Sequence, residues 1–345
     1  MNRKHIILTI LILFITFALA NCNLPRISLA PATATQTEMP INVTPTETAP
    51  LPFATVELGL AENPLILALP PAADSPEQIN AAKVIASQFT ERTGYTVVTI
   101  VPDSYSALVE ALDKGNAHIV LLDPYAYELA FQKDLVRASY AVLKDGEGKY
   151  GAQFLARRRA DFTAYFDEGI EENTTEEAGV ALAQFADKKP CWSDEISPSG
   201  YVIPLGYLNE NQILTKPPAF VEGHPTVVRS LYASGICDFG ATYIDARKFP
   251  SLEDEFPDLV ERVMVVWQIP AIIPYNVLAF STKMPPEMRN LFAGLIPPIL
   301  QTDAGKAAFK TAYDIEEVEA VNDGYYEEFR IYVDESEVDL TTLVK

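Results

Sequence analysis

Residues 65–101, LILALPPAADSPEQINAAKVIASQFTERTGYTVVTIV, indicate the fold class because they predict strand, helix and strand in succession. The first five residues are a short apolar run. Ser75, followed by Pro76 and Gln78, matches a capping box with proline at the first helical position. Apolar side chains then recur at helical spacing as far as Gly94, which predicts the end of the helix. Residues 95–101 predict a buried strand.

The same alternation continues through most of the chain, on both sides of a glycine-rich turn at residues 146–151. Further strands are predicted at residues 118–122, 136–143, 152–157, 189–192, 237–242, 263–269 and 276–280. Further helices are predicted to begin near residues 104, 123, 175, 200, 225, 252, 285 and 303. Prolines in residues 270–274 predict an interruption between the last two strands. Repeated strand–helix–strand units predict parallel sheets wrapped by helices, with ligands beyond the carboxyl ends of the strands.

The length of 345 residues, 48% of them hydrophobic, exceeds one average domain and predicts two lobes. We expect residues 63–151 and 272–345 to form lobe I, and residues 152–271 to form lobe II as an insertion. Each lobe is predicted to be an α/β unit with a mainly parallel sheet flanked by helices. Two crossing strands would join the lobes, which is how a hinged clamp is connected.

Residues 1–22 match a secretory signal peptide, with a basic start and an apolar run over residues 6–20 that is too short to span a membrane comfortably. The run ends in Leu19-Ala20-Asn21-Cys22, which resembles a bacterial lipobox except that Asn21 stands where a smaller residue is usual. Residues 23–62 predict a Thr/Pro-rich tether. We therefore expect lipidation of Cys22 and an extracytoplasmic, membrane-anchored protein. The alternative is an ordinary signal peptide and a secreted or periplasmic protein.

The net charge of -21 argues against nucleic acid as a partner, because binding to phosphate backbones relies on clustered Lys and Arg. If the ligand is an anion, the global field repels it. The site would then have to use local dipoles or a local cation.

The cysteines and histidines do not have the spacing of metal ligands, so neither a metal nor a cofactor is expected. With Cys22 acylated, Cys191 and Cys237 remain as an even pair in an oxidising compartment. They are either a disulfide or two buried free thiols. No nucleophile or hydrolase motif is present, and we expect no enzymatic activity.

The segment CWSDEISPSGYVIP, residues 191–204, is the most informative for function. Pro204 is tolerated near a helix start, which predicts a helix beginning at Ser199 or Gly200. Its unpaired N–H groups, the helix dipole and the hydroxyls of Ser197 and Ser199 would converge on one point, an anion site without Lys or Arg. The alternative is that the two serines only cap the helix.

Several segments together resemble the phosphate, phosphite and phosphonate substrate-binding proteins of ABC transporters. The resemblance spans roughly residues 65–326 and rests on the segments 103–112, 123–127, 197–204 and 223–224 in that order. It implies a type II periplasmic-binding fold and a small oxyanion as ligand. It also implies an ABC permease and ATPase as partners.

The resemblance further implies ligand-binding roles for particular residues. Those in lobe I or at its boundary are Tyr105, Tyr125 and Tyr150. Those in the turn and the second lobe are Ser197, Ser199, Gly200 and His224, with Tyr243, Asp245 and Asn276 as candidates for contacting the organic part. The family usually has Asp after the histidine, whereas this chain has Pro225, and a surface-loop histidine is the alternative for His224. Alternative functions are the binding of a sulfur oxyanion or vitamin precursor, or a sensory module coupled to a membrane kinase.

Overall fold

The computed structural model describes residues 57–345 except residues 72 and 160. The predicted signal peptide, Cys22 and most of the predicted tether lie outside the described residues. The last residues of the predicted tether, 57–62, fold onto the first lobe, where the Thr96 N–H donates to the Gly59 carbonyl at 2.7 Å. No helix in the described ranges is both long enough and apolar enough to cross a membrane.

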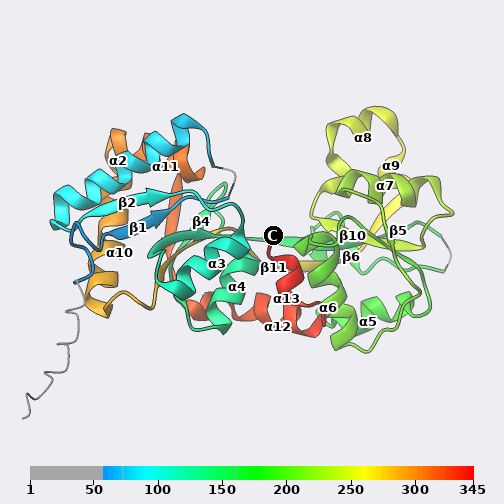
Figure 1. Cartoon of the computed structure of the whole chain (residues 1–345). Helices are drawn as coiled ribbons and strands as arrows, with labels where there is room; N and C mark the ends of the chain where they lie inside the picture. The colour runs from blue at the N-terminus through cyan, green and yellow to red at the C-terminus, as the bar shows by residue number, and fades with distance from the viewer. Residues whose placement is uncertain (1–56, 72, 160) are drawn as a thin grey trace, which may run out of the picture. The chain divides into compact units, whose positions relative to one another are not determined.

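The described part of lobe I contains a six-stranded sheet in the order β13-β4-β12-β3-β1-β2 (Figure 1). Its strands are β1 (Leu65–Ala68), β2 (Val97–Ile100), β3 (Ile119–Leu122), β4 (Val136–Leu143), β12 (Val277–Ser281) and β13 (Glu317–Ala320). Its helices are α2 (Pro76–Thr93), α3 (Tyr105–Lys114), α4 (Pro124–Gln132), α10 (Pro286–Leu300), α11 (Asp303–Tyr313), η4 (Asp323–Tyr326), α12 (Glu327–Glu335) and α13 (Leu340–Leu343).

The described part of lobe II contains a five-stranded sheet in the order β11-β5-β10-β8-β9 and a small hairpin, β6-β7. Its strands are β5 (Lys149–Arg157), β6 (Phe166–Asp167), β7 (Glu172–Asn173), β8 (Pro190–Trp192), β9 (Ala219–Phe220), β10 (Phe239–Tyr243) and β11 (Val263–Pro274). Its helices are α5 (Ala178–Leu182), η1 (Ala183–Phe185), η2 (Pro198–Val202), α6 (Ile203–Glu210), α7 (His224–Ala233), η3 (Ala246–Lys248), α8 (Pro250–Glu255) and α9 (Leu259–Arg262).

The two sheets confirm the predicted α/β class, but both are mixed rather than mainly parallel. In lobe I, β1 runs parallel to β2 and β3, whereas β12 runs antiparallel to β3 and β4. In lobe II, β8 runs parallel to β9 and β10, whereas β5 runs antiparallel to β10 and β11. The chain passes between the sheets from β4 to β5 and from β11 to β12, and the strands at these crossings account for most of the antiparallel pairs.

The prolines at residues 270–274 interrupt the pairing of β11, as predicted, but they do not end the strand, which continues to Pro274. Ile269 pairs with Ala152 and Ile273 with Tyr150, so the strand carries extra residues between these two pairs. A bulge of this kind leaves Pro270 outside the ladder, where its missing N–H does no harm. The edge position of β11 in the sheet allows this.

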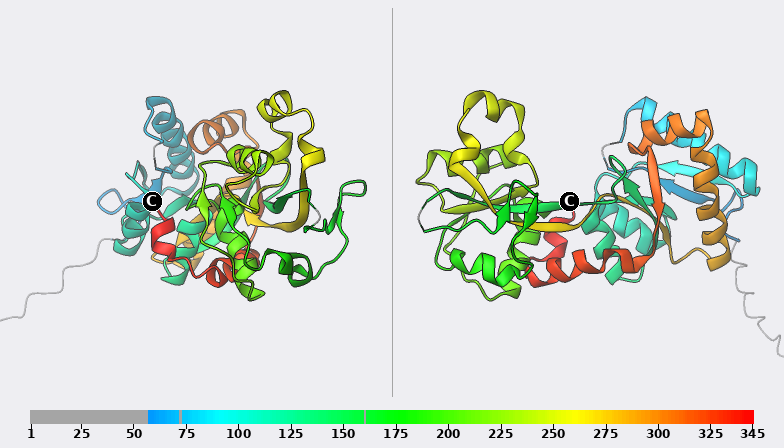
Figure 2. Two further views of the ribbon diagram at one scale, coloured as in Figure 1. Left: turned by 90° about the vertical axis from the view of Figure 1, so that its right-hand side faces the viewer. Right: turned by 180° about the vertical axis from the view of Figure 1, so that it is seen from behind.

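Apolar side chains on both faces of the lobe I sheet explain why its strands read as continuous apolar runs. Ile119 and Leu121 of β3 face one cluster, which includes Phe89 of α2 and Phe292 of α10, whose rings are 5.2 Å apart. Val120 and Leu122 face a second cluster with α3 and α4. Figure 2 shows α2 in cyan and α10 and α11 in orange over the same face of the sheet.

The helix boundaries of lobe I follow from side-chain caps that the sequence predicts. Ser75 Oγ accepts from the Gln78 N–H at 3.2 Å, and Ser104 Oγ accepts from the Ala107 N–H at 3.0 Å. Asp123 caps α4 in the same way, accepting from the Ala126 N–H at 2.7 Å. These caps fix where the loops after β2 and β3 end, at the carboxyl side of the sheet.

His118 is a buried histidine that the fold keeps neutral. Its side chain is 3% exposed, and Nδ1 accepts a hydrogen bond from the Ile66 N–H at 3.0 Å, which links the start of β3 to β1. Burial lowers the pKa of His118 to about 4. A protonated ring could not accept this bond, so the histidine is a pH-sensitive contact in lobe I.

Replacing His118 with Asn should flatten the pH dependence of stability. The folded pKa is below the unfolded value of about 6.5, so the unfolded chain binds more protons and stability falls as the pH drops below about 6.5. Asn keeps an acceptor oxygen but does not titrate. Between pH 6.5 and 5, we expect the wild-type free energy of unfolding to fall by about 2 kcal/mol more than that of H118N, as measured by urea denaturation. Equal pH dependence in the two proteins would contradict this assignment.

Candidate functional site

A disulfide holds the strand that leads into the candidate site. The sulfurs of Cys191 in β8 and Cys237 before β10 are bonded at 2.01 Å, with Cα atoms 5.6 Å apart. The segment 193–197 follows β8 directly and leads into η2. The disulfide therefore fixes the start of the turn relative to the neighbouring strand.

The helix begins at Pro198, one residue before the earliest predicted position. Residues 198–202 (η2) form a π-helical turn, in which the Val202 N–H donates to the Ser197 carbonyl at 3.1 Å. The α-helix α6 continues from Ile203. Ser197 Oγ accepts from the Gly200 N–H at 3.0 Å, so this serine does cap the helix. Within the described residues, the Ser199 N–H donates to no acceptor outside the helix, as is usual for the first N–H groups of a helix. Single π turns of this kind are frequent at functional sites.

Gly200 allows two other side chains to approach the turn. A Cβ atom at this position would collide with Ser193 Oγ and would lie 2.9 Å from Cε1 of His224. Only glycine fits such an approach without a shift of its neighbours. Ser193 and His224 are therefore packed against the first turn of the helix, and the Gly223 N–H donates to the Ser193 carbonyl at 2.7 Å.

Three buried polar atoms near this turn have no hydrogen-bond partner in the described structure: Ser193 Oγ, His224 Nδ1 and Tyr125 Oη. Buried polar atoms are normally paired, and an exception requires an explanation such as a ligand. Burial lowers the pKa of His224 to about 4, against the opposing charge of Asp194, so the imidazole is neutral at neutral pH. The turn thus gathers uncharged hydrogen-bonding groups.

A cavity of about 370 Å³ lies beside the turn, lined by Tyr150, Gly151, Ser199, His224, Tyr243, Ile244 and Tyr275. Within the described residues, no Lys, Arg, Asp or Glu lines it. The rings of Tyr150 and Tyr275 stack at 5.1 Å, and His224 meets Tyr243 edge-on at 4.7 Å. Burial raises the pKa of Tyr150 to about 12, partly offset by a hydrogen bond with the Ser199 side chain. The cavity combines neutral donors with aromatic walls.

The cavity brings together four of the predicted site residues, Tyr150, Ser199, His224 and Tyr243. Gly200 and Ser197 belong to the turn that forms its border.

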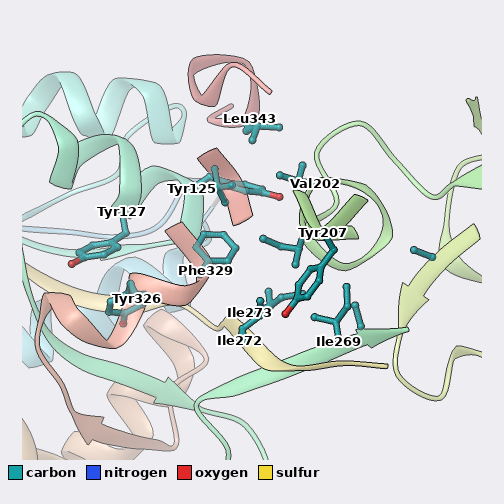
Figure 3. Close-up of a cluster of buried hydrophobic side chains, with 14 of the residues drawn as sticks. Tyr125, Tyr127, Val202, Tyr207, Ile269, Ile272, Ile273, Tyr326, Phe329 and Leu343 are labelled. Carbon is teal, nitrogen blue, oxygen red and sulfur yellow. The ribbon is translucent and has the colours of Figure 1, made fainter. Parts of the chain in front are cut away.

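Tyr125 lies on α4 in lobe I, with its hydroxyl directed towards Val202 of η2 (Figure 3). Burial raises its pKa, and so do electrostatic interactions with its neighbours Tyr150, Asp123 and Tyr201. Because such interactions act over short range, Tyr125 lies near the turn.

Six predicted site residues lie outside the cavity lining, namely Ser197, Gly200 and Tyr125 as described above, and Tyr105, Asp245 and Asn276. Tyr105 begins α3, where its N–H donates to the Lys345 carbonyl at 3.0 Å. Asp245 pairs with Lys248 at 2.9 Å and lines a separate cavity of about 270 Å³. Asn276 lies between β11 and β12, and its carbonyl accepts from the Val142 N–H at 2.9 Å.

Sequence reasoning missed two residues, Ser193 and Tyr275. Ser193 follows the predicted strand 189–192 directly, and this position at the carboxyl end of a strand was an available signal. Tyr275 is one of 16 tyrosines and gave no local signal, because its place in the cavity depends on the bulged course of β11.

Comparisons with known proteins identify the family. The model for the periplasmic substrate-binding protein of phosphonate ABC transporters matches residues 67–326. Phosphate-import protein PhnD of Mycolicibacterium smegmatis is 26% identical over 257 residues, covering 70% of this chain and 74% of that protein.

Solved structures agree in fold. XAC2383 from Xanthomonas citri bound to ATP has a TM-score of 0.57 at 15% identity and covers 81% of this chain and 99% of its own. The same protein bound to a chloride ion has a TM-score of 0.56 at 15% identity, covering 79% and 97%. The chain therefore belongs to the family of phosphonate-binding periplasmic substrate-binding proteins of ABC transporters, which are transport proteins and not enzymes.

Proposed function

We propose that this chain captures a small tetrahedral oxyanion, namely a phosphonate, phosphite or phosphate, by lobe closure, and delivers it to an ABC permease as a lipid-anchored protein. The observation that carries the proposal is the group of unpaired buried atoms around the turn at residues 197–201: Ser193 Oγ, His224 Nδ1 and Tyr125 Oη. The Ser199 N–H, which donates to no acceptor outside its helix among the described residues, adds a further donor.

The charge of the chain explains why neutral donors suit this ligand. A net charge of -21 gives the surface a field that opposes anions, so affinity has to arise at short range. Hydrogen bonds to an ionised oxygen are roughly twice as strong as neutral ones, and more so where water is excluded. A helix start adds its dipole in the same direction. Together these interactions offer an anion a favourable site without a cation.

Donors on both lobes support capture by closure. Tyr125 belongs to α4 of lobe I, whereas Ser199 and His224 belong to lobe II, and Tyr150 and Tyr275 lie next to the two crossings. A ligand held between these groups would draw the lobes together, because each side alone leaves part of the oxyanion unpaired. Phosphate is the first ligand to test, since the Mycolicibacterium smegmatis relative is named a phosphate-import protein.

Calorimetric titration tests the ligand class. We expect methylphosphonate, phosphite or phosphate to bind, and sulfate to bind more weakly. Ser199→Ala should weaken binding about 10- to 100-fold, because a hydrogen bond to a charged group contributes about 1.5–3 kcal/mol. Ser75→Ala, which removes a helix cap far along the chain, is the matched control and should leave the affinity unchanged. Heat from none of the three phosphorus anions, with a folded chain, would refute the ligand class.

Ser193→Ala separates a ligand contact from a structural one, because the two roles predict opposite effects. Removing a buried unpaired hydroxyl should leave the ligand-free protein as stable as wild type or more stable, whereas the affinity should fall. Ser281 is the matched control, since it is buried and its Oγ accepts from the Lys283 N–H at 3.2 Å. Ser281→Ala should lose about 1 kcal/mol of stability and keep its affinity. Urea denaturation measures the stability of both variants, and calorimetric titration measures their affinity. An S193A protein with lowered stability and normal affinity would argue against a ligand contact of Ser193.

Cys22→Ser tests the lipid anchor. We expect the wild-type chain, expressed in a bacterium, to incorporate labelled palmitate and to partition into the detergent phase of Triton X-114. The variant should do neither, because the thiol that accepts the lipid is gone. A wild-type chain that stays in the aqueous phase without label would rule out the anchor and leave the oxyanion site unaffected.

A further inference from the structure

Helix α12 is fixed to lobe I through α4. Arg330 Nε donates to both carboxylate oxygens of Glu128, at 2.8 and 2.9 Å, and Glu128 is fully buried. The ring of Phe329 lies 5.7 Å from the ring of Tyr125. A carboxylate without exposure requires such a partner, so this ion pair holds α12 in one place on α4.

The chain end after α12 is also fixed to lobe I, through α3. The carbonyl of Val344 accepts from Ser106 Oγ at 2.6 Å, and the carbonyl of Lys345 accepts from the Tyr105 N–H at 3.0 Å. Both ends of the segment 327–345 are therefore tied to lobe I. Helix α12 is therefore held on lobe I at the place where it contacts lobe II.

Helix α12 also contacts α6 of lobe II. The rings of Tyr332 and Tyr207 stack at 3.8 Å with an interplanar angle of 7°. Asn209 Nδ2 donates to the carbonyls of Glu335 and Ser336 at 3.0 and 3.3 Å. Gly206 lies so close to the main chain of Tyr332 that a Cβ atom there would collide with its carbonyl group.

These contacts link both halves of the candidate site. Phe329 packs against Tyr125, the lobe I donor, and Tyr207 lies on the helix that continues η2 without a break. Figure 3 shows Tyr125, Phe329, Val202 and Tyr207 in one buried cluster that extends to β11. A displacement of α12 would therefore change the distance between the Tyr125 hydroxyl and the turn at residues 197–201.

We propose that α12 is a positioning element for ligand capture, in which the Tyr332–Tyr207 stack sets the separation of the donors on the two lobes. The inference rests on the proposed function, because the separation matters only if one ligand contacts both sets of donors. The stack borders a cavity of about 640 Å³, whose lining includes Trp267, Pro270 and Glu210. The two stacked rings therefore have a cavity on one side, so that removing one ring disturbs few other contacts.

The test uses the full chain and three variants. Tyr332→Ala removes the stacked ring, and Tyr332→Phe keeps it. Ile331→Ala is the matched control, since Ile331 lies on the same helix and is 43% exposed. Titration with phosphate and methylphosphonate measures affinity, and hydrogen exchange of the ligand-free protein measures local opening.

We expect Tyr332→Ala to weaken binding about tenfold, because the donors must be brought together at the cost of ligand affinity. The affinity of Tyr332→Phe should stay within about threefold of the wild-type affinity, and Ile331→Ala should bind as tightly as wild type. In the ligand-free Y332A protein, exchange should rise in residues 198–210 and stay unchanged in the strands of lobe I. Tyr125→Phe should cost less affinity in the Y332A background than in wild type, because the hydroxyl is no longer held in place.

Unchanged affinity in Y332A, or a loss of affinity with a uniform rise of exchange over both sheets, would overturn the positioning role. If the wild-type chain binds none of the anions, the proposed function fails, and the exchange comparison still decides whether the stack holds the first turn of the helix. A local rise in residues 198–210 then supports that role, and no local rise refutes it.

Discussion

A buried hydrogen-bonding group without a partner costs a folded protein about 1–3 kcal/mol, and this chain keeps several of them around one helix start. The cost is acceptable only if something else completes the bonds during function. Ser193 Oγ and the His224 ring lie against Gly200, where a side chain would collide with both. The proposed ligand site therefore depends on one glycine that lets donors crowd together and on a fold rigid enough to keep them unpaired.

The second sheet supplies that rigidity. Strand β8 is tied to the segment before β10 through the Cys191–Cys237 disulfide, and it pairs with β9 and β10 on its two sides. The turn at residues 193–201 leaves the carboxyl end of this strand, and α6 carries it away as a helix. Since both ends of the turn are fixed, its N–H groups cannot easily rearrange to bond with one another. A flexible loop with the same residues would satisfy its own donors and lose the site.

Much of the fold could be predicted because its signals are local. The caps at Ser75, Ser104 and Asp123 and the stop at Gly94 are read from a few neighbouring residues, and α2, α3 and α4 begin where they predict. The course of β11 could not be predicted, since Pro270 is tolerated only through a bulge whose partner is β5, more than a hundred residues earlier in the chain. Local signals also gave no account of β13 or α12, which are defined by the elements they pack against.

The candidate site divides in the same way. Ser197, Ser199 and Gly200 are found from the turn itself, because the chemistry of a helix start is contained in its own sequence. Tyr275 stacks on Tyr150 only after two crossing segments meet, and Asp245 lines a different cavity, where it pairs with Lys248. If the proposed function holds, the neutral donors bind an oxygen only at hydrogen-bonding distance, so geometry contributes more than charge to selection. Among the described lining residues there is no Lys or Arg, so no side-chain cation there adds an attraction that acts on every anion.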